Sequence, residues 1–270
     1  MRVQGRLMAV KAAESRQRYA PRKDGMRKPE KERIDVLLVE RGLAATRHGA
    51  LAVIMAGKVL VNGVTVDKAG KEVGRDSGIT LKEEMPYVSR GGVKLAGALD
   101  EFGIDVKGVT AVDVGASTGG FTDCLLKRGA GFVSAVDVGK GILDIKLRND
   151  PRVRVLEERN IRHMDPSELP ERADIVVIDV SFISLEKVLL VVKGFLKEGG
   201  KALALIKPQF EVGKGQVGKG GIVKDPERHR EVVEKIKGFS ASIGFNVLAT
   251  AQSPITGVRG NKEFWIYLSV

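Results

Sequence analysis

Five apolar-rich runs divide the last two thirds of the chain, and each ends in a polar or glycine-rich segment. The runs cover residues 109–114, 132–136, 153–156, 175–178 and 202–206. Short runs that are apolar at nearly every position are typical of strands covered on both faces. A helix with Phe121, Leu125 and Leu126 on its apolar face is expected after the first run. The pattern predicts a doubly wound, mostly parallel α/β sheet, with a last strand that begins near Glu263.

The segment 33–85 shows a different pattern, in which helical spacing gives way to short strands. Apolar residues at helical spacing predict a helix over 33–41, and Thr46 is the expected N-cap of a second helix. Residues 59–66 predict two strands joined by an Asn-Gly turn, which is the strongest short hairpin signal. A third short strand is expected at 79–81. The segment is therefore predicted to be a small α+β unit.

These patterns divide the chain into four segments. Residues 1–32 are dense in Arg and Lys without a packed apolar pattern, so we expect a flexible basic tail. Residues 33–85 form the small α+β unit, 86–93 a linker, and 94–270 a Rossmann-like catalytic domain. The linker is inferred from Pro86, which favours extended backbone just before it.

Composition limits the class of protein. Of the 270 residues, 43% are hydrophobic, which is enough for a packed core, and the formal net charge is +11. The single cysteine, Cys124, excludes an intramolecular disulfide and a cysteine-based zinc cluster. The histidines are too scattered to form a ligand set, so we expect no metal. No apolar run approaches the roughly 18–20 residues of a membrane span. These features favour a cytoplasmic protein with a phosphate-bearing partner and no membrane contact.

Basic side chains gather at the predicted helix ends and turns of the small unit. The candidate RNA contacts are Arg33, Arg41, Arg47, His48, Lys58, Lys68 and, in the predicted linker, Arg90. The motifs Arg33-Ile-Asp-x-x-Leu-x-x-x-Gly42, Thr46-Arg47 and Gly57-Lys-Val-x-Val-Asn62-Gly resemble the RNA-binding module named after ribosomal protein S-four. That resemblance, rather than the charge, implies RNA instead of duplex DNA.

The turn after the first apolar run has the spacing Gly-x-x-x-Gly-Gly, with Asp113 just before it. This spacing differs from the Gly-x-Gly-x-x-Gly of dehydrogenases. It resembles the methionine-binding turn of S-adenosylmethionine enzymes, which implies that cofactor. Asp137 ends the second run, where a carboxylate can hold a ribose diol, and Asn160 either meets adenine or caps a turn. The candidate cofactor contacts are Asp113, Gly115, Ala116, Ser117, Thr118, Gly119, Gly120, Phe121, Asp137, Asn160 and Asp179.

Four charged residues lie where such a sheet opens, namely Lys94, Asp179, Lys207 and Glu263. The set is similar to the Lys-Asp-Lys-Glu set of ribose 2'-O-methyltransferases of the FtsJ type. Together with Ser-Arg-Gly-Gly-x-Lys94-Leu, Asp-Val-Ser-Phe-Ile-Ser and Ile-Lys207-Pro-Gln-Phe-Glu, it makes residues 33–270 resemble the TlyA family. The resemblance implies methylation of cytidine 2'-hydroxyls in ribosomal RNA or ribosomal subunits.

A role for each of the four residues follows from this chemistry. A ribose hydroxyl is a poor nucleophile until it loses its proton, and a lysine with the ordinary pKa of about 10.4 is protonated at neutral pH. Burial, a second lysine and the donor's positive charge would each favour the neutral amine. We expect Lys207 to be the base, Lys94 its electrostatic neighbour, and Asp179 and Glu263 to orient lysines and hydroxyl.

Several alternatives stay open. Many TlyA-like proteins carry the name haemolysin, so a pore-forming protein is one alternative and a non-catalytic RNA-binding protein another. Base methylation is disfavoured because Asp179 precedes Val-Ser-Phe rather than Pro-Pro-Tyr, and because Cys124 is expected to pack in a helix. Residues 213–219 match part of a P-loop, but Gly220 stands where Ser or Thr would hold magnesium. The sequence leaves open the target nucleotide, naked RNA or an assembled subunit as substrate, and the oligomeric state.

Overall fold

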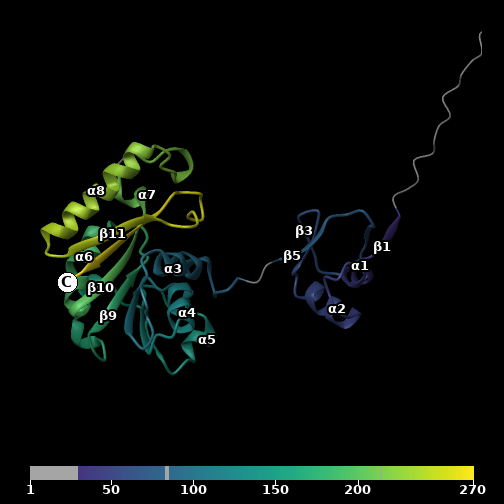
Figure 1. Cartoon of the computed structure of the whole chain (residues 1–270), viewed down its shortest axis with the longest axis horizontal. Helices are drawn as coiled ribbons and strands as arrows, with labels where there is room; N and C mark the ends of the chain where they lie inside the picture. Colours follow the sequence, from purple (N-terminus) through teal and green to yellow (C-terminus); the bar gives the residue numbers. More distant parts are fainter. Residues whose placement is uncertain (1–29, 83–84, 214) are drawn as a thin grey trace, which may run out of the picture. The chain divides into compact units, whose positions relative to one another are not determined.

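The computed structural model describes residues 30–82, 85–213 and 215–270. The chain divides into two compact units, with the boundary between Glu83 and Glu84 (Figure 1). The expected tail over residues 1–32 lies outside the described residues except at its end. There the expectation is wrong, because Lys31 and Glu32 belong to strand β1 (Lys31–Arg33), which pairs with β4 (Glu72–Gly74).

The smaller unit contains both predicted helices and all three predicted strands. They are α1 (Ile34–Glu40), α2 (Arg47–Met55), β2 (Val59–Val61), β3 (Val64–Val66) and β5 (Ile79–Leu81). The hydroxyl of Thr46 accepts a hydrogen bond of 3.1 Å from Gly49 N, as expected of an N-cap. Ile34, Leu38 and Ile54 are fully buried between the helices and the antiparallel sheet β3-β2-β5.

The larger unit is built around one sheet. Within residues 85–213 and 215–270 its strands are β6 (Thr110–Val114), β7 (Phe132–Val136), β8 (Val153–Leu156), β9 (Ala173–Ile178), β10 (Leu196–Ile206), β11 (Asn246–Gln252) and β12 (Phe264–Ser269). Their order is β11-β12-β10-β9-β6-β7-β8, and β12 runs antiparallel to both of its neighbours (Figure 1). The predicted Rossmann-like sheet is confirmed. Because the chain order reverses between β6 and β9, their carboxyl ends form a switch point where ligands bind in such sheets.

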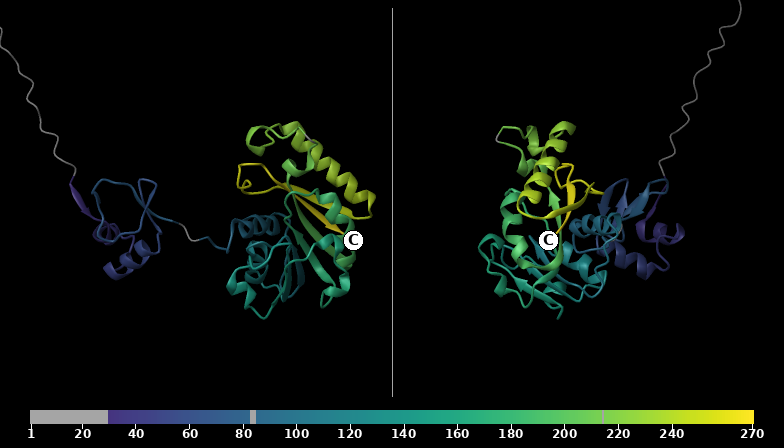
Figure 2. Two further views of the ribbon diagram at one scale, coloured as in Figure 1. Left: turned by 180° about the vertical axis from the view of Figure 1, so that it is seen from behind. Right: turned by 60° about the vertical axis from the view of Figure 1, so that its left-hand side comes forward.

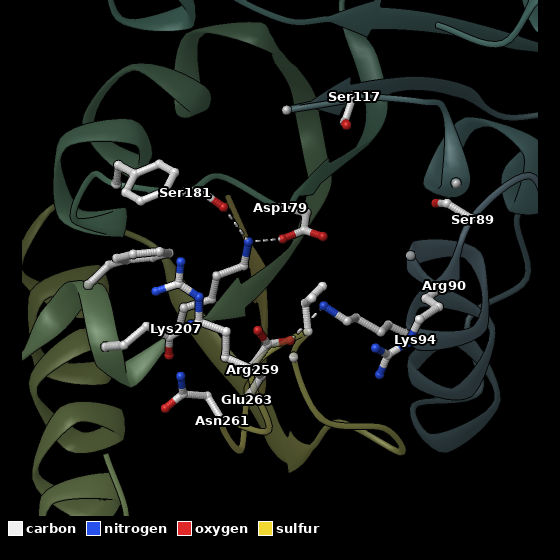
Figure 3. Close-up of a pocket in the computed structure, with 18 of the residues that line it drawn as sticks. Ser89, Arg90, Lys94, Ser117, Asp179, Ser181, Lys207, Arg259, Asn261 and Glu263 are labelled. Carbon is white, nitrogen blue, oxygen red and sulfur yellow. Dashed lines mark hydrogen bonds and ion pairs between the residues drawn. The ribbon is translucent and has the colours of Figure 1, made fainter. Parts of the chain in front are cut away.

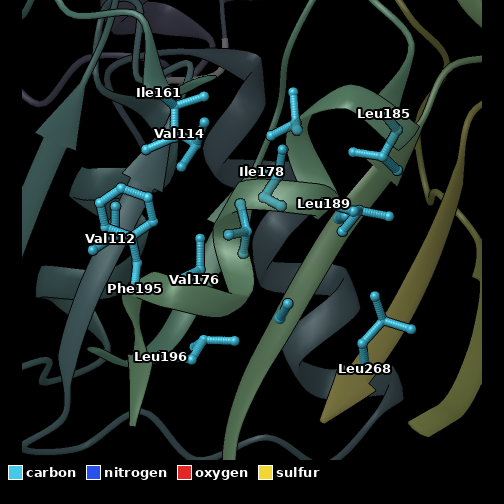
Figure 4. Close-up of a cluster of buried hydrophobic side chains, with 14 of the residues drawn as sticks. Val112, Val114, Ile161, Val176, Ile178, Leu185, Leu189, Phe195, Leu196 and Leu268 are labelled. Atoms are coloured by element: carbon cyan, nitrogen blue, oxygen red, sulfur yellow. The ribbon is translucent and has the colours of Figure 1, made fainter. Parts of the chain in front are cut away.

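Helices cover both faces of this sheet (Figure 2). The main helices are α3 (Arg90–Glu101), α4 (Gly120–Lys127), α5 (Ile145–Arg148), α6 (Leu185–Val192), α7 (Pro208–Glu211) and α8 (Pro226–Ser242). Short 3-10 turns are η1 (Ile161–His163), η2 (Pro166–Glu168), η3 (Lys193–Phe195) and η4 (Lys219–Gly221). Val176 and Ile178 of β9 pack with side chains of α6 (Figure 4) and of α8. Ile175 and Val177, on the other face, pack with α3 and α4. Burial of both faces explains why the strands are apolar at nearly every position.

Two parts of the larger unit differ from the sequence prediction. The expected linker, residues 86–93, includes the first turn of α3, in which Gly92 is buried against Tyr87. The pair Gly91-Gly92 is unfavourable in an isolated helix, but close packing against neighbouring side chains favours residues without a side chain at these positions. Strand β11 was not predicted, because its residues alternate between exposed and half-buried at the sheet edge. No helix in the described part of the chain is both long and apolar enough to span a membrane.

Candidate active site

The glycine turn joins β6 to α4 by a left-handed backbone. Gly115 has φ +84 and Gly119 has φ +94, and a Cβ on Gly115 would lie 2.6 Å from the backbone oxygen of Asp179. Glycine is therefore required where the turn passes the end of β9. The backbone amide of Ser117 donates a 2.8 Å hydrogen bond to the Asp137 carboxylate, so the second candidate acid holds the turn in shape.

A cavity of about 420 Å³ opens beside this turn, at the carboxyl ends of β6, β7 and β9. It is lined by Gly115, Ser117, Asp137, Asn160 and Asp179 among the predicted residues. Apolar side chains, including Val138, Ile142 and Ile161, complete its wall. Asn160 both lines the cavity and caps η1 by accepting a hydrogen bond from Arg162 N. The two interpretations of Asn160 are therefore compatible.

Asp113 lies behind the turn rather than in a cavity. It is fully buried, and its Oδ2 accepts hydrogen bonds from the backbone amide and the hydroxyl of Thr122 in α4. Burial raises the pKa of this carboxyl to about 7. Asp113 lines neither of the two cavities at this edge of the sheet, and its bonds hold the first turn of α4 against β6. A direct contact of Asp113 with a cofactor stays a prediction.

The four charged residues come together in a second cavity of about 720 Å³ (Figure 3). Lys207 Nζ lies 2.5 Å from Asp179 Oδ1 and donates a 2.9 Å hydrogen bond to Ser181 Oγ. Lys94 Nζ lies 2.6 Å from Glu263 Oε2. All four side chains are at least four-fifths buried. Each lysine of the quartet therefore has a carboxylate partner, so the two lysines form two ion pairs in one cavity.

The two cavities share one edge of the sheet. Gly115, Ser117 and Asp179 line both, as do Ser181 and Phe182. Ala116, Thr118, Gly120 and Phe121 of the turn line only the larger cavity. Gly119 lines neither cavity, because it packs against α5, where a Cβ would lie 2.3 Å from the Leu147 side chain. A molecule in the smaller cavity would therefore lie next to the charged quartet.

Some lining residues were not predicted. The sequence pattern predicts no role for Ser181, whose hydroxyl accepts a hydrogen bond from Lys207. It predicts none for Asn261 either, whose side chain joins two loops at the cavity. The hydroxyl and amide types are common on surfaces, so the sequence alone gives no signal for either. Cys124 lines neither cavity, and burial raises the pKa of its thiol to about 11. Its exclusion as a nucleophile is therefore supported.

Three of the candidate RNA contacts in the smaller unit also bind other parts of that unit. Arg33 and Arg47 both form ion pairs with the buried Asp35, yet their side chains stay 48% and 61% exposed. Arg41 donates to the backbone oxygens of Arg75 and Ser77. Of the other three, His48 and Lys68 are exposed and Lys58 is half-buried. Arg90 belongs to the larger unit, where it lines the 720 Å³ cavity. RNA binding by any of them stays a prediction.

Comparison with known families accounts for this architecture. Residues 87–270 match the model described as FtsJ-like methyltransferase, and residues 32–79 match the S4 domain. The chain belongs to the FtsJ-like methyltransferase family. Both cavities of this FtsJ-like methyltransferase, with the whole charged quartet, lie inside the matched segment.

Relatives confirm the resemblance to the TlyA family. YqxC of Bacillus subtilis, provisionally named an rRNA methyltransferase, is 49% identical over 240 residues, which cover 88% of this chain and 85% of that protein. The 16S/23S rRNA (cytidine-2'-O)-methyltransferase TlyA of Mycobacterium tuberculosis is 45% identical over 87% of this chain and 89% of its own length. A solved structure from Streptococcus thermophilus, provisionally named a hemolysin, is 43% identical with a TM-score of 0.69, covering 90% of this chain and 89% of that one.

Proposed function

We propose that this FtsJ-like enzyme transfers a methyl group from S-adenosylmethionine to the 2'-hydroxyl of cytidine in ribosomal RNA. The observation that carries the proposal is the pair of buried lysine–carboxylate contacts beside the smaller cavity. The name of the Mycobacterium tuberculosis relative supports both ribose and cytidine as targets. Ribosomal RNA or a ribosomal subunit, met in the cytoplasm, is the proposed partner.

The smaller cavity, of about 420 Å³, lies in the range of about 300–1,000 Å³ for small-molecule sites, and its lining suits the chemistry of the proposed donor. Asp137 Oδ1 and Oδ2 each accept one backbone hydrogen bond, and a carboxylate has about four acceptor sites, so capacity remains for a ribose diol. The apolar wall suits an adenine ring, with Asn160 at its polar edge. The glycine turn leaves backbone accessible for the methionine part. When bound, S-adenosylmethionine supplies an electrophilic methyl group on a positively charged sulfur.

The quartet suits the activation of a hydroxyl. Lys207, in its neutral form, accepts the proton of the 2'-hydroxyl at Nζ, and Asp179 with Ser181 fixes the direction of that nitrogen. Lys94 and Glu263, which lie 2.6 Å apart, would orient the hydroxyl. Positive charge on the bound donor favours release of the hydroxyl proton to a neighbouring base. Alignment of the oxygen with the methyl group supplies much of the rate.

The smaller unit is proposed to bring the enzyme to structured RNA. Its S4 match and its exposed basic side chains support this role. Removal of residues 1–85 should weaken RNA binding strongly and donor binding little. Equal RNA affinity of the full and shortened chains would contradict the role.

The test is transfer of tritium from labelled S-adenosylmethionine to ribosomal RNA and to isolated subunits, followed by digestion to nucleosides. Label in 2'-O-methylcytidine is the expected result, and a Lys207→Met variant should incorporate label at least about a hundredfold more slowly. Label in a base would contradict the lysine mechanism. Donor binding without any label in either form of RNA would contradict the catalytic proposal.

A further inference from the structure

Two arginines stand at the mouth of the larger cavity. Arg90 and Arg259 both line it, and both side chains are exposed. Figure 3 shows Arg90 beside Lys94 and Arg259 on the side of Lys207, so that the quartet lies between them. Neither arginine has a carboxylate partner within residues 30–82, 85–213 and 215–270, whereas Arg128 pairs with Asp100 and others pair likewise.

One loop carries Arg259 and holds the guanidinium group of Arg90. The loop joins β11 to β12 and carries Arg259 itself, while its Thr256 carbonyl accepts a 2.7 Å hydrogen bond from Arg90. Asn261, only 3% exposed, anchors the loop: its side chain accepts from Val223 N at 3.0 Å and donates to the Gly221 oxygen at 2.8 Å. The fold therefore holds the guanidinium group of Arg90 in place and anchors the loop from which Arg259 extends.

The larger cavity has a positive arginine on each side and the two ion pairs of the quartet between them. The inner residues form two neutral ion pairs, so the excess charge comes from the two arginines. The bonded guanidinium of Arg90 keeps free N–H groups, and Arg259 uses none of its own in a hydrogen bond within the described residues. In an RNA strand each ribose lies between two phosphates. Guanidinium groups bind phosphate by two parallel hydrogen bonds.

We infer that Arg90 and Arg259 bind the phosphates on either side of the target ribose, one each, and so hold its 2'-hydroxyl over the quartet. The inference rests on the proposed function, which it extends by naming the residues that grip the substrate strand. An arginine at the same place could instead bind the carboxylate of the methyl donor, and the test separates these ligands.

The experiment compares Arg90→Gln, Arg259→Gln and Arg172→Gln in the full chain. Arg172 is the matched control, since it is exposed and precedes β9, at the end of the strand away from the cavity. The probe is a short single-stranded oligoribonucleotide that contains cytidine, and its Kd is measured over a range of salt concentrations. Each site variant should bind about tenfold more weakly. Its slope of log K against log salt should fall by about 0.7, the value for one phosphate contact on a single strand.

Two further measurements make the result decisive. Donor affinity by calorimetry should match the wild type in every variant, and Arg259→Lys should keep the salt slope while losing part of the affinity, because it retains charge but not the planar fork. Weaker donor binding with an unchanged salt slope would overturn the inference, and so would an equal loss in Arg172→Gln. If the wild type methylates no RNA, the proposed function fails, but the salt slopes still decide whether the arginines bind phosphate.

Discussion

Asp35 is the residue whose replacement most directly separates folding from RNA binding in the smaller unit. Its side chain is 2% exposed and contacts Arg33 at 3.0 Å and Arg47 at 2.9 Å. The hydrogen bond from Arg33, the largest cause, and that from Arg47 lower its pKa from 3.8 to about 2. A shift of this size corresponds to about 2 kcal/mol of stability. Because both arginines are about half exposed to screening solvent, we expect Asp35→Asn to cost about 1 kcal/mol.

Hydrogen exchange in the full chain would measure this cost. Amides of α1 and α2 should exchange about fivefold faster in Asp35→Asn at neutral pH, as a 1 kcal/mol loss implies. The control is Glu32→Gln, which removes a more exposed 3.3 Å contact with Arg75 and should change little. Since the carboxyl pKa is depressed in the folded state, its stabilisation is present above pH about 4 and lost as the pH falls towards 2.

Two results would refute this reasoning about Asp35. One is an equal effect of the Asp35 and Glu32 substitutions on exchange in α1 and α2. The other is a difference between wild type and Asp35→Asn that persists undiminished near pH 2. RNA affinity provides a further check, because Asp35→Asn leaves both guanidinium groups in place and removes a negative charge beside them. A large loss of RNA affinity in a folded variant would mean that the ion pairs orient the arginines for RNA.

Three more substitutions test the larger unit. Lys207→Met should lower kcat by at least about a hundredfold while calorimetry shows unchanged donor affinity; normal turnover would remove it as the base. Asp137→Ala should weaken donor binding about tenfold or more, since it removes the proposed ribose acceptor and the hydrogen bond that shapes the turn. Equal affinity would contradict this role. Trp265→Ala should lower the free energy of unfolding by about 3–5 kcal/mol, because the side chain is fully buried. Unfolding in urea is followed by circular dichroism, since the variant has no tryptophan left for fluorescence, and an unchanged midpoint would contradict the effect of burial.

The sequence predicted the elements whose signal is local. Runs that are apolar at nearly every position identified the five strands β6 to β10, because burial on both faces imposes that pattern. The Asn-Gly hairpin and the Thr46 cap were predicted for the same reason, since each depends on a few adjacent residues. Strand β1 was missed because the three residues Lys31, Glu32 and Arg33 are all charged, and only pairing with β4 makes them a strand.

The sequence also named the four charged residues, through family resemblance and their places at strand ends. It did not determine which of these residues form ion pairs with each other. Lys94, near the start of the domain, pairs with Glu263, near its end. Nor did it determine that Asp113 is buried in the core while Asp137 lines a cavity. Ion pairs and side-chain directions depend on contacts between distant segments, which the order of strands in the sheet creates. The amino-acid pattern thus determined which segments are buried and which residue types could react, whereas the packing of the sheet decided which charges pair with one another and which line a cavity.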